Sequence, residues 1–182
     1  MPELSLNILD LAENSFTAGA SIIEVKIEED TDSDTLSLTV RDNGIGMDAD
    51  QLKKVSDPLY STKEQREWGL GIPFLQQTAD LCSGKLLVNS APGRGTEITL
   101  KVQLSHIDRP PLGDLPGTIA AVIAGHEDKN LSLIIRKDSE TYNFQTEVIR
   151  SELGEIRLSG AEILDFIERD IAEGLRKLEF VQ

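Results

Sequence analysis

The chain has 182 residues, 39% of them hydrophobic, which is enough to bury a core and excludes a chain that is disordered throughout. The net charge of −14 argues against nucleic acid and against an anionic membrane surface as partners, because no basic stripe is present to displace counterions. The single cysteine, Cys82, excludes an intramolecular disulfide. Together with the lack of a signal peptide and of a long apolar run, it leads us to expect a cytoplasmic protein that does not cross a membrane.

Helix and strand patterns alternate along the first half of the chain. Residues 3–18 repeat apolar side chains with the period of a helix. Alternating residues predict two β-hairpins, at 21–42 and 85–104. Between them we expect a glycine-rich turn, a loop over 48–68 and a helix that begins at 69 and ends just before Gly84. This order predicts an α/β (α+β) two-layer sandwich, with helices on one face of a mixed, largely antiparallel sheet.

A proline- and glycine-rich segment, HIDRPPLGDLPG at 106–117, interrupts this pattern. We therefore expect a boundary between a domain over residues 1–105 and a small α+β extension over 106–182. The extension is predicted to contain a short helix, a hairpin and two further helical stretches. The last stretch begins with a capping-box pattern, in which Ser159 is the N-cap and Glu162 is the third helical residue.

Several short patterns carry candidate chemistry. Asp10 and Asn14 lie one helical turn apart, so a carboxylate and an amide share a face and can hold a hard cation through oxygen. The DNGIGM turn at 42–47 follows a strand directly, and its glycines let a flat ligand approach the backbone. The glycines of WGLGI at 68–72 open a helix, whose free N–H groups and dipole attract phosphate. Each pattern alone also has a purely structural explanation: a solvated helix face, a turn or, for GRGT at 93–96, a hairpin loop.

In chain order these patterns read LDLAENSFTAGAS, DNGIGM, DPLYSTKE, GLGI and GRGT. The series resembles the ATP-binding domain of the GHKL superfamily, which includes DNA gyrase, the ninety-kilodalton chaperone, histidine kinases and the MutL mismatch-repair proteins. The resemblance covers about residues 4–104 and implies the Bergerat α/β fold, ATP as ligand and Mg²⁺ as cofactor. The run from LDLAENS to SHIDRPPLGD also resembles stand-alone ATP-binding proteins of anaerobic bacteria that are encoded near iron-hydrogenase genes.

The resemblance implies a role for individual residues. By it, Asn14 ligates Mg²⁺, and Asp42 accepts a hydrogen bond from the exocyclic amine of adenine. Asp10 stands where ATP-hydrolysing members have a glutamate as general base, and its shorter side chain implies slow hydrolysis. The other nucleotide contacts are implied at Gly44 and Gly46 beside adenine, at Thr96 at the base of its pocket, and at Lys63, Gly69, Leu70 and Gly71 around the phosphates.

Three functions stay open at this point. The chain is a nucleotide-dependent switch or slow ATPase acting on a partner protein, a small serine or histidine protein kinase of the anti-sigma-factor type, or an ATP-sensing module without turnover. The patterns support ATP binding and leave catalysis, the partner and a homodimer undetermined. SHIDRPPL at 105–112 also matches a phosphoacceptor box in letters. Pro110 disrupts a helix around His106, so we expect a segment boundary there and not a phosphorylated histidine.

Overall fold

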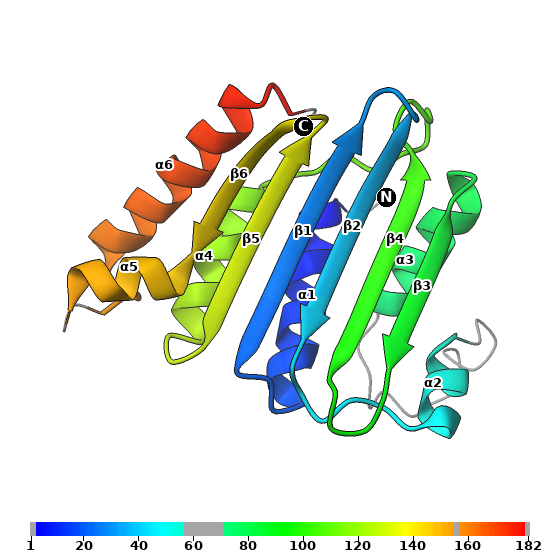
Figure 1. Ribbon diagram of the computed structural model, residues 1–182, viewed down its shortest axis with the longest axis horizontal. Coiled ribbons are helices and arrows are strands. Elements are labelled where there is room, and N and C mark those ends of the chain that lie inside the picture. Colours follow the sequence, from blue (N-terminus) through cyan, green and yellow to red (C-terminus); the bar gives the residue numbers. More distant parts are fainter. Residues whose placement is uncertain (1–2, 57–70, 155–156, 181–182) are drawn as a thin grey trace.

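The computed structural model describes residues 3–56, 71–154 and 157–180. Within them, six strands form one sheet in the order β3-β4-β2-β1-β5-β6 (Figure 1). The β1–β5 pairing is parallel and the other four pairings are antiparallel. The strands are β1 (Ile22–Asp30), β2 (Thr35–Asp42), β3 (Lys85–Ser90), β4 (Thr96–Gln103), β5 (Asn130–Lys137) and β6 (Glu140–Gln145).

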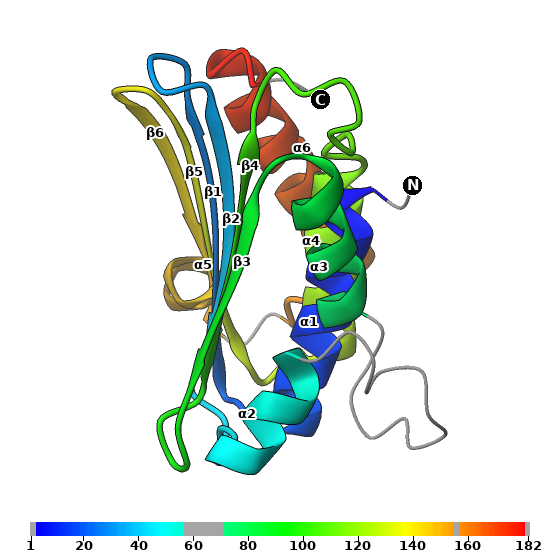
Figure 2. The same ribbon diagram turned by 90° about the vertical axis from the view of Figure 1, so that its right-hand side faces the viewer.

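Helices cover one face of this sheet, which confirms the predicted two-layer sandwich. The helices are α1 (Leu4–Thr17), α2 (Ala49–Ser56), α3 (Gly71–Leu81), α4 (Leu115–Gly125), α5 (Thr146–Leu153) and α6 (Ala161–Lys177). Figure 2 shows α1, α3, α4 and α6 on the same side of the strands, with α1 in contact with both α3 and α4. In the part of the chain that the structure describes, no helix combines the length and the apolar character needed to cross a bilayer.

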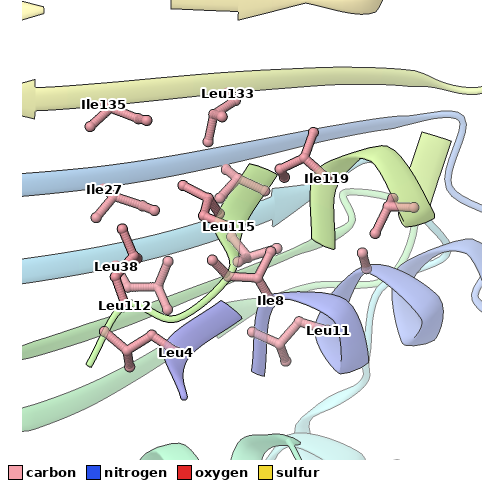
Figure 3. Close-up of a cluster of buried hydrophobic side chains, with 14 of the residues drawn as sticks. Leu4, Ile8, Leu11, Ile27, Leu38, Leu112, Leu115, Ile119, Leu133 and Ile135 are labelled. Atoms are coloured by element: carbon pink, nitrogen blue, oxygen red, sulfur yellow. The ribbon is translucent and has the colours of Figure 1, made fainter. Parts of the chain in front are cut away.

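The core lies between the sheet and the helical layer. Side chains alternate between the two faces of each strand, so one set points inward and is buried. Ile27 of β1 and Leu133 of β5 meet Ile8 of α1 and Ile119 of α4 there, and none of the four is measurably exposed (Figure 3). Burying each such side chain contributes roughly 1.5–3 kcal/mol. Cys82 is also fully buried, and this burial raises the pKa of its thiol.

The C-terminal hairpin extends the same sheet. β5 pairs with β1 in a register that places Ile23 opposite Leu131, and β6 follows at the sheet edge. α6 covers β6 closely because Gly174 has no side chain: a Cβ there would lie 2.5 Å from the ring of Tyr142. The Tyr142 hydroxyl donates a hydrogen bond of 2.6 Å to Asp170 of α6. The strands on both sides of residues 105 and 106 therefore share one sheet, while the domain boundary expected there stays a prediction.

The predicted loop over 48–68 is wrong in its first part, which forms α2. Oδ1 of Asp48 accepts hydrogen bonds from the backbone N–H groups of Asp50 and Gln51, at 2.9 and 2.8 Å. In return, Oε1 of Gln51 accepts one of 2.9 Å from the backbone N–H of Asp48. This is a reciprocal capping box, and it satisfies N–H groups that a helix start leaves free.

The capping box predicted at Ser159 is also wrong. α6 has Gly160 as its N-cap, without a side-chain hydrogen bond to the helix. The Ser159 hydroxyl donates instead to the carboxylate of Glu127, at 3.0 Å. As an N-cap the hydroxyl would accept from a backbone N–H of the helix, whereas here it donates to a charged acceptor, which makes a strong hydrogen bond.

Candidate functional site

Asp42, the last residue of β2, is held by three hydrogen-bond donors. The hydroxyl of Ser15 on α1 donates to Oδ2 of Asp42 at 2.9 Å. The backbone N–H groups of Gly44 and Thr96 both donate to Oδ1, at 2.8 and 3.2 Å. A carboxylate has about four acceptor positions in its plane, so the donors within the described part of the chain leave one position, on Oδ2, for a further donor. The residue predicted to accept from adenine is thus a fixed acceptor with one place open.

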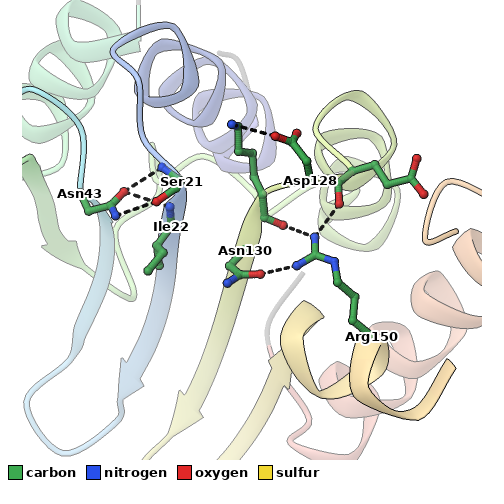
Figure 4. A network of polar contacts seen from close by, with 8 residues as sticks. Ser21, Ile22, Asn43, Asp128, Asn130 and Arg150 are labelled. Atoms are coloured by element: carbon green, nitrogen blue, oxygen red, sulfur yellow. Dashed lines mark hydrogen bonds and ion pairs between the residues drawn. The ribbon is translucent and has the colours of Figure 1, made fainter. Parts of the chain in front are cut away.

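Asn43, the next residue, holds the end of β2 against the start of β1. Its Oδ1 accepts hydrogen bonds from the backbone N–H groups of Ser21 and Ile22, at 2.8 and 2.9 Å, and its Nδ2 donates to the Ser21 hydroxyl at 2.9 Å (Figure 4). These contacts limit how far the backbone beside Asp42 can move. Sequence reasoning did not single out Asn43, although an asparagine in a turn commonly bonds nearby backbone groups.

The glycine turn at 42–47 interlocks with the turn between β3 and β4. A Cβ on Gly46 would lie 2.0 Å from the carbonyl oxygen of Ala91, and one on Gly95 would lie 1.9 Å from that of Asp42. Both glycines also have positive φ, at +67° and +73°, which side chains disfavour. The backbone N–H of Gly93 donates to the carbonyl of Ile45 at 2.7 Å. The two turns therefore pack backbone against backbone and hold Thr96 at Asp42.

Gly44 is crowded in the same way on its other side. A Cβ there would lie 2.9 Å from the carbonyl oxygen of Ala18, which follows α1, and 3.1 Å from Oδ1 of Asp42. These glycines are thus explained by the close approach of the backbone. Their contacts with an adenine ring stay predictions.

Asp10 and Asn14 lie on one side of α1, both partly buried. Oδ2 of Asp10 comes so near Gly71, the first residue of α3, that a Cβ on this glycine would lie 2.7 Å from it. A helix start carries free N–H groups and the positive end of the helix dipole. The fold therefore brings Asp10 to a place suited to anions, while Lys63, Gly69 and Leu70 lie outside the described residues.

The side-chain oxygens of Asp10 and Asn14 on α1 suit a magnesium ion that is held partly by water and ligand, and not a metal ion held entirely by protein side chains. Among residues 3–56, 71–154 and 157–180, no group of three or more histidine, cysteine or acidic side chains gathers as a metal site would. Mg²⁺ usually keeps several water ligands and uses one or two protein oxygens plus the phosphates of its substrate. The amide oxygen of Asn14, one turn from the Asp10 carboxylate, matches that requirement.

A cavity of about 420 Å³ lies at this end of the sheet. Its lining includes Asp42 and Thr96, which point to the helical side, and Arg41 and Glu97, which alternate to the other side. The cavity therefore lies at the ends of β2, β3 and β4. Among the described residues that line it, none belongs to α1, so Asp10 and Asn14 are not part of its wall.

His106 follows β4 in a turn and is not part of a helix. Its Nδ1 accepts a hydrogen bond of 3.1 Å from the backbone N–H of Asp108. Next to it, the side chains of Ser105 and Gln103 donate to Asp34 at 2.7 and 2.8 Å, and these bonds lower the pKa of that carboxyl group. The segment is a strand end tied to the β1–β2 turn, as its prolines indicated.

Comparison with known proteins relates this chain to a family of ATPases. The family model for histidine kinase-, DNA gyrase B-, and HSP90-like ATPases matches residues 2–106. Sporulation kinase E of Bacillus subtilis is 34% identical over 111 residues, covering 60% of this chain and 15% of that protein. Sensor histidine kinase RcsC of Salmonella typhimurium is 27% identical over 161 residues, covering 86% of this chain and 16% of its own length. This chain thus spans about a sixth of these relatives.

A solved structure supports the same fold. The N-terminal domain of a DNA repair protein superposes with a TM-score of 0.54 and 16% identity, covering 79% of this chain and 52% of that one. At this identity the likeness concerns the fold alone. The chain belongs to the histidine kinase-, DNA gyrase B-, and HSP90-like ATPase family, and the matched residues are those of an ATP-binding domain of this type. The predicted superfamily is confirmed; the narrower hydrogenase-associated group stays a prediction.

Proposed function

We propose that this chain binds Mg·ATP on the helical side of the sheet and works as a nucleotide-dependent switch, with slow hydrolysis, on a partner protein. One observation carries the proposal: α1 reaches both ends of the site. Its Ser15 donates to Asp42, and its Asp10 lies against Gly71 at the start of α3. Five residues of helix separate these two contacts, or about 7.5 Å along the axis. An adenine and a chain of phosphates can occupy the two ends at once.

Asp42 supplies the specificity for adenine in this proposal. The exocyclic amine of adenine is a donor, and the open acceptor position on Oδ2 can receive it. Guanine carries a carbonyl oxygen at the corresponding atom, which a carboxylate repels. Gly44, Gly46 and Thr96 border the ring, and Thr96 additionally holds Asp42 through its backbone N–H.

The phosphate end combines a helix start with a metal ion. Asn14 ligates Mg²⁺, which, when bound, neutralises negative charge between the phosphates. Gly71 offers the N-terminal end of α3, and Gly69, Leu70 and Lys63 complete the phosphate contacts. For a chain with a net charge of −14, such local donors are what makes an anionic ligand acceptable.

Hydrolysis is slow in this proposal because Asp10 is a short base. It would take a proton from the attacking water, for which its oxygen must come within about 2.6–3.2 Å of the water. Its carboxylate sits against Gly71, and it has one methylene less than the glutamate of hydrolysing relatives. A second water molecule would then have to pass the proton from the attacking water to the Asp10 carboxylate.

The proposal is tested by calorimetry with Mg·ATP and by phosphate release. The wild type should bind Mg·ATP and release phosphate slowly, whereas Asp10→Asn should bind with similar affinity and release phosphate more slowly still, by up to about 100-fold, the lower end of the usual contribution of a general base. Asp80→Asn makes the same chemical change on the exposed far end of α3 and serves as control. An equal release rate in Asp10→Asn removes Asp10 as the base, and no binding of Mg·ATP by the wild type refutes the proposal.

The relatives favour a second candidate, phosphoryl transfer to a protein, because both are named as kinases. The same binding site would serve it, with a hydroxyl or imidazole of another protein in place of water. ATP labelled at the γ-phosphate separates the two. Label that appears in free phosphate supports the switch, whereas label that appears on a protein supports the kinase.

A further inference from the structure

We propose that His126 is a positioning residue for the nucleotide site, which acts by fixing the rotation of α1. The inference rests on the proposed function, since α1 carries Asp10 and Asn14. His126 belongs to the C-terminal half of the chain, outside the residues that the family model matches. It would give that half a role in nucleotide binding.

His126 contacts α1 at two places. It is the C-cap residue of α4, and its Nε2 lies 3.0 Å from Oε2 of Glu13. Its ring also packs on that of Phe16, with the centroids 4.0 Å apart and the planes at 32°. Glu13 and Phe16 flank Asn14 and Ser15 in the sequence, so the contact is made beside the residues that face the ligand.

The segment before α4 holds the other end of α1. The backbone N–H groups of Leu4 and Ser5, in the first turn, donate to the carbonyls of Pro111 and Leu112, at 3.0 and 2.9 Å. Gly113 has φ of +77° and leaves no room for a Cβ, which would lie 2.6 Å from the Ser5 hydroxyl. The proline-rich segment therefore fixes the start of α1 through backbone hydrogen bonds, and His126 contacts α1 near its end.

His126 is itself held in place from α5. Its carbonyl accepts from the backbone N–H of Lys129 at 3.0 Å. The guanidinium of Arg150 donates to the carbonyl of Glu127 at 2.6 Å, and also to the Lys129 carbonyl and the Asn130 side chain (Figure 4). The turn that carries His126 into β5 is thus braced, so the imidazole is a firm support for α1.

The geometry of a helix links this contact to the site. Glu13 and Phe16 contact His126 at the end of α4, and Asp10, three residues before Glu13 on the same helix, lies against Gly71 of α3. Side-chain ends lie about 5–6 Å from the helix axis, so a rotation of about 10° moves them by about 1 Å. A displacement of that size is enough to impair a positioned catalytic or metal-binding group. Asn14, which would supply an oxygen to Mg²⁺, would be displaced together with the rest of α1.

The dependence of ATP affinity on Mg²⁺ distinguishes a positioning role of His126 from a role in the stability of the fold alone. Affinity for ATP is measured with Mg²⁺ and with a chelator, and the ratio of the two dissociation constants gives the gain from the metal. His126→Ala should reduce this gain about tenfold, because a rotated α1 misplaces Asn14, with little change in affinity without metal. His126→Gln should restore it, because the glutamine amide can still donate to Glu13.

Two further variants complete the design. Glu13→Ala removes the same contact from α1 and should reproduce the effect of His126→Ala, and the double variant should be no worse than either. Thr31→Ala, the control, loses a side-chain bond to Asp138 of 2.9 Å in the turn after β1 and should keep the full metal gain. Should His126→Ala not fold, His126→Gln and Glu13→Ala still give the comparison.

The outcomes are distinct. A reduced metal gain in His126→Ala and Glu13→Ala, rescued by His126→Gln, supports the proposal. An unchanged gain, or equal losses with and without Mg²⁺, means that His126 only stabilises the fold and overturns it. If the wild type binds no Mg·ATP, the proposed function itself fails. If the wild type binds and shows no dependence on Mg²⁺, the role of Asn14 fails and this inference with it.

Discussion

Gly95 gives a sharp test of how the β3–β4 turn supports Asp42, because the same turn contains a matched control. Gly95 and Gly93 have nearly equal positive φ, +73° and +72°. A Cβ on Gly95 would lie 1.9 Å from the carbonyl oxygen of Asp42, whereas one on Gly93 would meet nothing within 4 Å. Gly93→Ala therefore adds only backbone strain, and Gly95→Ala adds the same strain and a clash.

The expected costs follow from these contacts. A left-handed alanine costs roughly 1–2 kcal/mol, which is the full expectation for Gly93→Ala. In Gly95→Ala the turn must also move away from Asp42, which breaks the bond from the Thr96 N–H to the carboxylate. A hydrogen bond to a charged group is worth roughly 1.5–3 kcal/mol, so the total loss of unfolding free energy is about 2.5–5 kcal/mol.

Urea unfolding of both variants, followed by circular dichroism, measures the two losses. Mg·ATP titration of the folded variants shows whether the site is affected, and we expect weaker binding for Gly95→Ala alone. Equal losses of stability in the two variants, at or below about 2 kcal/mol, would refute the packing of this turn on Asp42.

Three further predictions concern the fold around the site. Gly174→Ala should lower the free energy of unfolding by about 1–2 kcal/mol in urea melts, because overpacking against Tyr142 outweighs the better helix propensity of alanine. Burial and the bond to Asp170 raise the pKa of Tyr142 in the folded protein. Its contribution to the free energy of unfolding is therefore fully present below about pH 10, the pKa of a tyrosine in the unfolded chain, and is lost at higher pH. Tyr142→Phe, which has no hydroxyl to ionise, should lose less stability than the wild type between about pH 9 and pH 11. Asp48→Ala should cost roughly 0.5–2 kcal/mol, with the helix signal of α2 reduced, whereas an unchanged melt would rule out its capping box with Gln51.

Local chemistry explains which parts of the fold the sequence could predict. The hairpins and α1 followed from periodicity, since one face of each is buried. α2 was missed although D-A-D-Q at 48–51 is a capping-box pattern, because Leu52 and Val55 are the only large apolar residues in its eight positions and too few to set a helical period apart. The opposite error occurred at Ser159, where the same kind of pattern was present and a distant carboxylate, Glu127, took the hydroxyl.

Contacts between distant segments could not be predicted in the same way. The helical period places Ser15 among the apolar residues of α1, and it is buried there, but its bond to Asp42 joins residues that are 27 apart in the chain. A buried polar side chain on an apolar face was the signal, because such a group needs a partner. The parallel pairing of β5 with β1 and the contact of His126 with Glu13 have no local signature at all.

The most direct test of the nucleotide site is a titration of wild type and Asp42→Asn with Mg·ATP and with Mg·GTP. Asparagine keeps an oxygen for Gly44 and Thr96 and an amide that can donate to Ser15, so the local structure is preserved. It places a donor where the adenine amine needs an acceptor. Losing a hydrogen bond to a charged group costs roughly 1.5–3 kcal/mol, which corresponds to about 10- to 100-fold weaker ATP binding. We predict that loss for ATP and a smaller preference for ATP over GTP; unchanged ATP affinity in Asp42→Asn would contradict the proposed site.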